Sequence, residues 1–220
     1  MVADPAGRGH GVPVRWPALL ARAQALVDVG DRRILGITGP PGAGKSTVAR
    51  RLVDMLGDTA ALVGMDGYHL AQAELERLGY AEHKGAPDTF DAAGYVALLH
   101  RLREPAAGTV YAPEFRRAIE EPIAGAIAVP PHVRLVVTEG NYLLLEAAPW
   151  SAIHRLLDEV WFLAPDEQTR RAWLTARHRR YGRTAKQAAE RTSGSDERNA
   201  RLIAPTASRA DLILDPTRLI

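Results

Sequence analysis

The stretch Gly39-Pro40-Pro41-Gly42-Ala43-Gly44-Lys45-Ser46-Thr47 decides the fold of this chain. It satisfies the pattern G-x-x-x-x-G-K-[ST], which cradles nucleotide phosphates when it follows a strand and opens a helix. Both conditions are predicted here, because an apolar run over residues 33–38 precedes the stretch and a helical pattern over residues 45–56 follows it. The glycines allow backbone N–H groups to turn toward a phosphate, and the helix N-terminus adds its positive dipole end.

The positions of this phosphate loop have expected roles. Lys45 would reach the β- and γ-phosphates, and Ser46 would bind Mg²⁺. A Gly/Pro turn could match the pattern by chance, and the pattern alone does not distinguish a kinase from a GTPase or a mechanical ATPase. The nucleotide-binding residues predicted in the loop are Gly39, Pro40, Gly42, Ala43, Gly44, Lys45, Ser46 and Thr47.

Outward from the loop, short apolar strands alternate with helical patterns. Such strands, joined by helical crossovers, are typical of a parallel sheet covered on both faces. The sequence therefore predicts an α/β doubly wound P-loop fold with a five-stranded parallel sheet flanked by helices. Strands are predicted over 33–38, 61–65, 134–138, 159–163 and 210–214, and helices over 17–29, 45–56, 91–103, 150–157, 166–180 and most of 184–203.

Length and composition fit one globular domain. The chain has 220 residues, of which 46% are hydrophobic and 25% charged. We expect a flexible tail over residues 1–15 and a single domain over 16–220. The absence of cysteine excludes disulfides, thiolate zinc sites and a cysteine nucleophile. No stretch approaches the roughly 18 apolar residues of a membrane helix, so we expect no membrane contact and a cytoplasmic protein.

Two carboxylates follow predicted strands. Asp66 comes after the strand at 61–65, and Glu139 comes after the strand at 134–138. In an open α/β sheet, ligands bind at the carboxyl ends of the strands, so both side chains should face the phosphate loop. A carboxylate there can accept a hydroxyl proton or hold Mg²⁺. The alternative is that each carboxylate only caps a turn.

Four motifs together resemble a known group of enzymes. The stretches GPPGAGKST (39–47), MDGYHL (65–70), KGAPDTFD (84–91) and VVTEGNYLLL (136–145), with a late arginine-rich helix, are similar to the uridine kinase, phosphoribulokinase and bacterial pantothenate kinase group. The resemblance covers about residues 34–214 and is strongest to a branch described as nucleoside/nucleotide kinase-like or fructokinase-like. It implies an NMP-kinase-like P-loop NTPase fold and ATP with Mg²⁺ as cofactors.

The resemblance also implies roles for the two carboxylates. Asp66 would be the general base for the acceptor hydroxyl, and Glu139 would lie near Mg²⁺ and the γ-phosphate. The function implied is transfer of the γ-phosphoryl group of ATP to a hydroxyl of a small polar metabolite, which could be a sugar, a nucleoside or a pantothenate-like alcohol. The metal ligands expected are Ser46 and Glu139, and the catalytic residues are Asp66, Lys45, Glu139 and Arg177.

The acceptor would lie against the segment 84–91 and a flap over about 109–129, expected to be short strands beside the sheet. The residues 87–91 also form a sound helix start, with Asp88 or Thr89 available as cap. Lys84 stands out because the chain has only three lysines, although it could be a solvated side chain, and His69 could be a core histidine. The acceptor-site candidates are His69, Lys84, Asp88, Tyr111, Arg117 and Asn141.

Residues 170–201 carry nine arginines and one lysine against three acidic residues. This concentration predicts a lid that closes over the triphosphate, with Arg177 on the transferred group and Arg180 and Arg183 on the nucleotide. The stretch 195–199 resembles an Asp-x-x-Asn element, which would place Asn199 near the nucleotide base; a helix break explains it equally well. A solvated basic face or a nucleic-acid patch are the alternatives, and without regularly spaced aromatics we expect no nucleic-acid partner.

The alternative to a kinase is a protein from a different class of function. A regulatory P-loop ATPase or nucleotide switch would hydrolyse its nucleotide without a small-molecule acceptor. A GTPase should carry an Asn-Lys-x-Asp motif, and no lysine of this chain follows an asparagine. The pair Asp66 and Glu139 therefore favours the kinase, and the family makes a homodimer possible.

Overall fold

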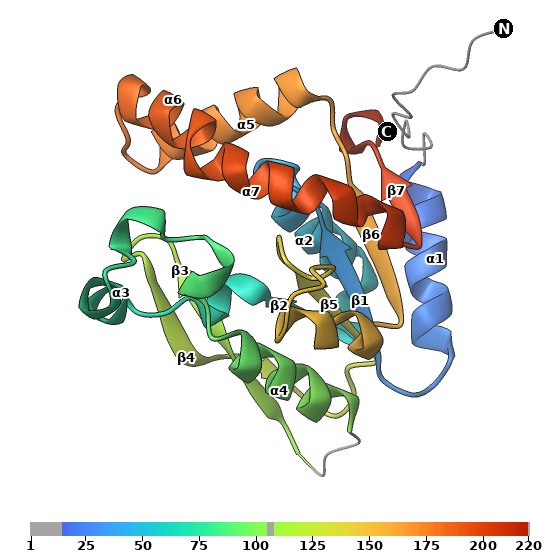
Figure 1. The fold of residues 1–220 in the computed structure, drawn as a ribbon. Coiled ribbons are helices and arrows are strands. Elements are labelled where there is room, and N and C mark those ends of the chain that lie inside the picture. The colour runs from blue at the N-terminus through green and yellow to red at the C-terminus, as the bar shows by residue number, and fades with distance from the viewer. Residues whose placement is uncertain (1–14, 105–107, 220) are drawn as a thin grey trace, which may run out of the picture.

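The computed structural model describes residues 15–104 and 108–219, and most of the tail expected over residues 1–15 lies outside the described residues. Its centre is a five-stranded parallel sheet with the strand order β2-β5-β1-β6-β7 (Figure 1). The predicted fold class and all five strands are confirmed, with ends that differ by no more than two residues. The strands are β1 (Arg33–Thr38), β2 (Ala60–Gly64), β5 (Leu135–Glu139), β6 (Glu159–Leu163) and β7 (Leu212–Leu214).

Both faces of this sheet are covered. Alternate residues of β1 point to opposite faces, so Ile34 joins one apolar cluster while Leu35 and Ile37 join the other. Helices α1 (Trp16–Asp28) and α2 (Lys45–Leu56) supply the cluster on one face. Helix α4 (Ala92–Arg103), the C-terminal end of α7 (Ser195–Ile203) and the turns after β5 supply the other.

The strand order creates the ligand crevice. Because β5 lies between β1 and β2, the chain that leaves β1 through the phosphate loop and α2 must pass over β5 to reach β2. The carboxyl ends of β1, β2 and β5 therefore meet at one edge of the sheet, where the strand order reverses direction. Ligands of doubly wound folds bind at such a point.

The flap is an antiparallel hairpin outside the main sheet. It consists of β3 (Val110–Arg116) and β4 (Glu121–Val129), with a register shift between Ala112 and Glu114. A short helix that the sequence analysis did not predict, α3 (Gln72–Leu78), lies with this hairpin to one side of the sheet (Figure 1). The predicted short strands of the flap are thus confirmed.

The arginine-rich region forms three helices above the crevice (Figure 1). Helix α5 (Glu167–Arg180) begins after Asp166, whose side chain accepts a hydrogen bond from the Thr169 N–H group. Helix α6 (Ala185–Ser193) begins with a capping box between Thr184 and Gln187, and Gly194 separates it from α7. The helical stretch predicted over 184–203 is therefore two helices with a break at this glycine.

Two local predictions were wrong. Residues 150–157 form two short 3₁₀ turns, Trp150–Ala152 and His154–Leu156, and not a continuous α-helix. The apolar side chains at 150, 153 and 156 recur every three residues, which is the repeat that a 3₁₀ turn places on one side. Helix α4 is capped by Asp91, which accepts from the Gly94 N–H group at 2.8 Å, because Asp88 and Thr89 belong to a separate turn.

Within residues 15–104 and 108–219, none of the helices has both the length and the apolar character that crossing a bilayer requires.

Candidate active site

The phosphate loop has the backbone that its glycines predict. Gly39, Gly42 and Gly44 all have positive φ angles, of 143°, 84° and 85°. A Cβ atom would lie 2.6 Å from a backbone oxygen at Gly39 and 2.7 Å from one at Gly42, so both positions exclude side chains. Helix α2 begins at Lys45, and no described side chain caps its first turn. Its first N–H groups are therefore directed toward the crevice as an anion site.

Lys45 lies buried inside this loop. Its Nζ atom donates hydrogen bonds to the backbone carbonyls of Gly39, at 2.9 Å, and Pro40, at 3.1 Å. Burial lowers the pKa of Lys45 to about 8, although the charge of Glu139 opposes this shift. The loop thus holds a cation that is costly to keep charged unless an anion lies beside it.

Ser46 and Glu139 meet across the crevice. The Ser46 hydroxyl donates a hydrogen bond to Glu139 Oε1 at 2.8 Å. Burial and the nearby carboxylate of Asp66 raise the pKa of Glu139. Among the described residues there is no cluster of three or more His, Asp or Glu side chains that could hold a metal ion alone. A hydroxyl and a carboxylate beside a phosphate loop nevertheless fit Mg²⁺, which takes few protein ligands when phosphates complete its shell.

Asp66 occupies the short turn that follows β2. Its Oδ2 atom accepts a hydrogen bond from Arg117 Nη2 at 2.8 Å. Burial alone would raise the pKa of Asp66, but the charge of His69 when it is protonated, together with the charges of Arg117, Arg177 and Lys45, outweighs burial and lowers it. The carboxylate is therefore ionised at neutral pH, as a proton acceptor must be.

One cavity of about 1240 Å³ joins these groups. It exceeds the roughly 300–1,000 Å³ usual for a single small ligand, so it has room for a nucleotide and a second molecule. Gly39, Pro40 and Ala43 of the loop do not line the cavity, and the carbonyls of Gly39 and Pro40 accept hydrogen bonds from Lys45. The predicted residues that line the cavity are Gly42, Gly44, Lys45, Ser46, Thr47, Asp66, His69, Lys84, Arg117, Glu139, Asn141, Arg177, Arg180, Arg183 and Asn199.

Two predicted acceptor residues do not reach the cavity. The Asp88 side chain is exposed and pairs with His83 at 3.3 Å. Tyr111 is 59% exposed on the outer face of β3. The alternation of burial along β3 reverses at Pro113, because Val110 and Ala112 are buried whereas Pro113 and Phe115 are the less exposed residues further along; Phe115 therefore lines the cavity while Tyr111 is exposed.

Asn199 contacts the segment 84–91, which was expected to bind the acceptor, and its expected place near the nucleotide base stays a prediction. Its Nδ2 atom donates a hydrogen bond to the Gly85 carbonyl at 3.1 Å, and the Tyr142 hydroxyl donates to the same oxygen. The neighbouring Asp196 carboxylate pairs with His178 at 2.7 Å. The element resembling Asp-x-x-Asn therefore joins α7 to the loop around Gly85 and to α5.

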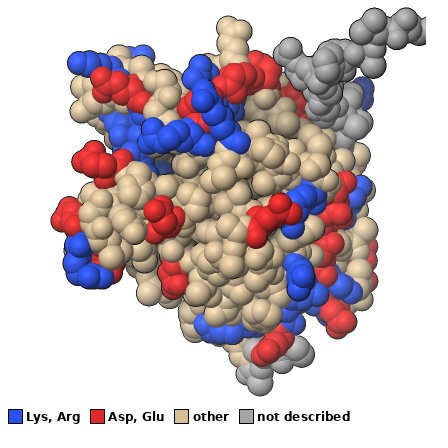
Figure 2. Space-filling model, in the orientation of Figure 1, with Lys and Arg blue, Asp and Glu red and all other residues tan. Residues whose placement is uncertain are grey.

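Of the nine arginines of residues 170–201, one contacts the phosphate loop and four line the cavity. Arg170 is 2% exposed and donates to the carbonyl of Pro41 and to the carboxylates of Glu167 and Glu197, so it fixes the lid helices to the phosphate loop. Figure 2 shows the basic side chains that gather along the lid helices on the face in view. The arginines that line the cavity are Arg177, Arg180, Arg183 and Arg191.

Several cavity residues were not among the predicted site residues. Arg191, Phe115, Gln72 and Trp173 all line the cavity. Arg191 could have been found from its place in the arginine-rich segment, but nothing in the sequence separates it from Arg198 or Arg201. The side chain of Arg177, which was predicted, is largely buried, and burial and the like charge of Arg117 lower its pKa.

A comparison with protein families identifies the family of this chain. Residues 34–219 match the family model described as "Phosphoribulokinase / Uridine kinase family". The chain belongs to the phosphoribulokinase/uridine kinase family. It is therefore a P-loop kinase that uses a nucleotide and acts on small metabolites, as the four motifs predicted.

Individual relatives agree with this assignment. A Schizosaccharomyces pombe protein provisionally named a uridine kinase is 32% identical over 93% of this chain and 92% of its own length. A pantothenate kinase of Clavibacter sepedonicus is 37% identical over 52% of this chain and 37% of its own length. A crystal structure from Silicibacter sp. TM1040, provisionally described as a fructose transport system kinase, is 35% identical with a TM-score of 0.79, over 89% of this chain and 98% of that one.

Proposed function

We propose that this kinase transfers the γ-phosphoryl group of ATP to a hydroxyl group of a small polar metabolite, with Asp66 as the general base. One observation carries the proposal: the ionised carboxylate of Asp66 lines the same cavity as Lys45 and Glu139. Gly64 pairs with Glu139 in neighbouring strands, so Asp66, two residues further on, lies at the same edge of the sheet. If Asp66 only capped a turn, its carboxylate would not need to lie in the same cavity as Lys45 and Glu139.

The transfer step follows from these positions. The acceptor oxygen forms a bond to the γ-phosphorus while the bond from that phosphorus to the β,γ-bridging oxygen breaks, and ADP leaves with the bonding pair. The hydroxyl proton goes to the carboxylate of Asp66. Lys45 and Arg177 stabilise the negative charge on the phosphoryl oxygens, and they do so strongly because both lie in a buried site.

The contact with Arg117 prepares Asp66 for this role. Arg117 uses the Oδ2 atom of the carboxylate, and we assign the other oxygen, Oδ1, to the acceptor hydroxyl. The same cation keeps the pKa of Asp66 low, so the carboxylate is free of a proton when the acceptor binds. Arg117 is thus a positioning residue for the base.

Ser46 and Glu139 are the residues that would hold Mg²⁺. The bound ion would neutralise charge on the β- and γ-phosphate oxygens. Because the two side chains are hydrogen-bonded to each other, their oxygen atoms already lie side by side where the ion would bind. Burial raises the pKa of Glu139, and a cation bound at this position would oppose that shift because it favours the ionised carboxylate.

Asp66→Asn tests the proposal, because asparagine keeps the shape of the side chain and can still cap a turn. An acceptor is first found by a coupled ADP-release screen over sugars, nucleosides, hydroxy acids and vitamin alcohols. With that acceptor at saturation, we expect turnover of Asp66→Asn to fall by ~10²- to 10⁴-fold. The affinity for Mg·ADP, measured by calorimetry, should stay within about twofold.

Asp88→Asn is the matched control, because it makes the same chemical change at an exposed carboxylate outside the cavity. Its turnover should equal that of the unmodified protein. Unchanged turnover in Asp66→Asn would remove this carboxylate from the chemistry. A higher Mg²⁺ requirement with little loss of turnover would instead assign Asp66 to the metal ion.

A further inference from the structure

The part of the cavity beyond Asp66 contains cations without acidic partners. Lys84 Nζ donates to the side-chain carbonyl of Gln72, at 3.2 Å, and to the backbone carbonyl of Glu120, at 2.8 Å. Arg191 donates to the backbone carbonyl of Lys84. Within residues 15–104 and 108–219, neither cation forms an ion pair with Asp or Glu. Both positive charges are therefore held by neutral oxygens only.

Lys84 and Arg117 lie beside one aromatic ring, that of Phe115. The Phe115 ring centre lies 5.7 Å from Lys84 Nζ and 5.6 Å from Arg117 Cζ, and the His69 ring packs on it at 4.6 Å. Arg117 also touches Asp66, so the ring stands beside the position assigned to the acceptor hydroxyl. An acceptor on Asp66 would therefore have Lys84 and Arg117 within its reach.

His69 carries no charge at neutral pH, so it neither adds to nor reduces the positive charge around Phe115. Burial lowers the pKa of His69, and the neighbouring charges of Lys84 and Arg117 lower it further, although Asp66 opposes them. Its Nδ1 atom faces the backbone carbonyl of Asp66 at 2.9 Å. The imidazole is thus a neutral hydrogen-bonding group, and the side chains around Phe115 remain positive apart from Asp66.

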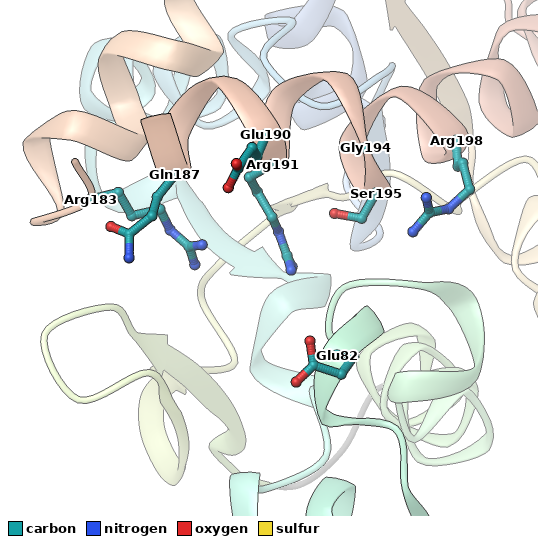
Figure 3. Close-up of a pocket in the computed structure, with 8 residues that line it drawn as sticks. All are labelled: Glu82, Arg183, Gln187, Glu190, Arg191, Gly194, Ser195 and Arg198. Atoms are coloured by element: carbon teal, nitrogen blue, oxygen red, sulfur yellow. The ribbon is translucent and has the colours of Figure 1, made fainter. Parts of the chain in front are cut away.

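The entrance to this part of the cavity is also basic. A smaller hollow of about 290 Å³ shares Arg183, Gln187, Arg191 and Glu82 with the main cavity. In Figure 3, Arg191 of α6 and Arg198 of α7, together with Arg183 just before α6, reach toward the short turn that carries Glu82. Three arginines thus stand against Glu82 and Glu190, and this excess would attract an anion to the entrance.

We propose that the phosphoryl acceptor is itself an anion, a small hydroxylated metabolite with a carboxylate or a phosphate group. Its hydroxyl would lie on Asp66 and its anionic group on Lys84, Arg117 and Arg191. The proposal rests on the function proposed above, because it takes Asp66 as the base. A neutral sugar or nucleoside would leave the partly buried Lys84 and Arg191 without a counter-charge, which is unfavourable compared with an anion that pairs with them.

The first experiment compares acceptors that differ in charge but keep similar hydroxyl groups. Coupled ADP release measures kcat/KM for glycerate against glycerol, gluconate against glucose and pantothenate against panthenol. Fructose 6-phosphate against fructose and ribulose 5-phosphate against ribulose form the phosphate arm. We expect the anionic member to be better by at least about tenfold in a pair that reacts. The two arms distinguish a carboxylate from a phosphate, and a neutral member that reacts as well as its anionic partner overturns the proposal.

Variants then locate the anion site. Lys84→Gln and Arg191→Gln should each raise KM for the reacting anion by about 10- to 100-fold, with a much smaller effect on any neutral acceptor. The matched controls are Lys186→Gln and Arg201→Gln, whose side chains are 87% and 80% exposed. Both should keep the original KM. An equal rise for charged and neutral acceptors would show that Lys84 only shapes the pocket and would overturn the proposal.

A binding measurement separates this inference from the proposed reaction. Each anionic member of the panel is titrated by calorimetry into the Mg·ADP complex of the unmodified protein and of Lys84→Gln. Binding that weakens in Lys84→Gln supports the anion site, even where Asp66→Asn shows that Asp66 is not the base. Binding that does not depend on Lys84, or no binding by any anionic member, overturns it.

Discussion

The cavity has a phosphate half and an acceptor half, and different kinds of chemical groups form the two. The phosphate half comes from one continuous stretch, residues 39–47, and its main binding groups are backbone N–H groups and a helix N-terminus. The acceptor half has no such continuous element. Its side chains come from the turn after β2, the loop before α4, the flap hairpin and α6, and they include His69, Lys84, Arg117 and Arg191.

This difference separates a site that tolerates few substitutions from a site whose ligand can change with single residues. A backbone site needs glycines at fixed positions, because any side chain at Gly39 or Gly42 would meet a backbone oxygen. A side-chain site changes its ligand when one residue changes, while the fold stays the same. We therefore expect substitutions in the phosphate half to affect every reaction of the enzyme, and those in the acceptor half to affect acceptors selectively.

The largest effect should come from the phosphate half. Lys45→Ala removes the cation that would contact the β- and γ-phosphates, and turnover should fall by ~10³-fold with every acceptor. The thermal midpoint should not fall much, because Lys45 is a buried ammonium group whose desolvation is costly. Turnover and differential scanning calorimetry test both parts. A loss of turnover with one acceptor but not with another would contradict the distinction between the two halves.

The lid arginines come next. Replacing Arg177, Arg180 and Arg183 together by Gln should slow phosphoryl transfer by ~10²-fold, because the lid charges act on the group that is transferred. ADP affinity should change far less, since the backbone of the loop holds the diphosphate. Arg179→Gln is the control on the same helix, outside the cavity lining. An equal loss of ADP affinity would show instead that the lid is part of the nucleotide-binding site.

A smaller effect should appear in the pH dependence of nucleotide binding. Lys45 has a pKa of about 8 in the free protein, so it loses its proton as the pH rises above 8. Bound phosphates would keep it protonated, because they are anions beside it. Nucleotide therefore binds the protonated form, and ADP affinity should fall about fivefold between pH 8 and pH 9. Calorimetry in two buffers should show proton uptake, whereas Lys45→Ala should show neither effect.

The smallest effect should come from the outer face of the flap. Tyr111 is exposed and points away from the cavity, so Tyr111→Ser should leave KM for the acceptor within about twofold. The measurement is a steady-state titration of the acceptor found in the screen. A rise of tenfold or more would show that the outer face of the hairpin takes part in acceptor binding and that the acceptor half is larger than the cavity described above.

The elements that were predicted well are those that depend on local pattern. The phosphate loop and α2 follow from glycine spacing and an apolar repeat, and α2 has the predicted bounds, 45–56. Helix α3 was missed because seven residues form a helix that is marginal without tertiary contacts, and the buried Leu75 provides those contacts. The irregular pairing of β3 with β4 around Pro113 was not predicted, so the sequence did not indicate that Tyr111 is exposed while Phe115 lines the cavity.

The sequence by itself determined the P-loop fold, the phosphate site and the two carboxylates at strand ends, because each depends on neighbouring residues or on the direction of a strand. Only the tertiary structure decided which cations gather in the acceptor half of the cavity. Lys84 and Arg191 are far apart in the chain, and the Arg191 side chain donates a hydrogen bond to the Lys84 backbone carbonyl. Asn199 contacts Gly85 because α7 crosses that loop. Contacts of this kind depend on how separate segments pack. A pattern in the sequence does not give the distance in space between segments that are far apart in the chain.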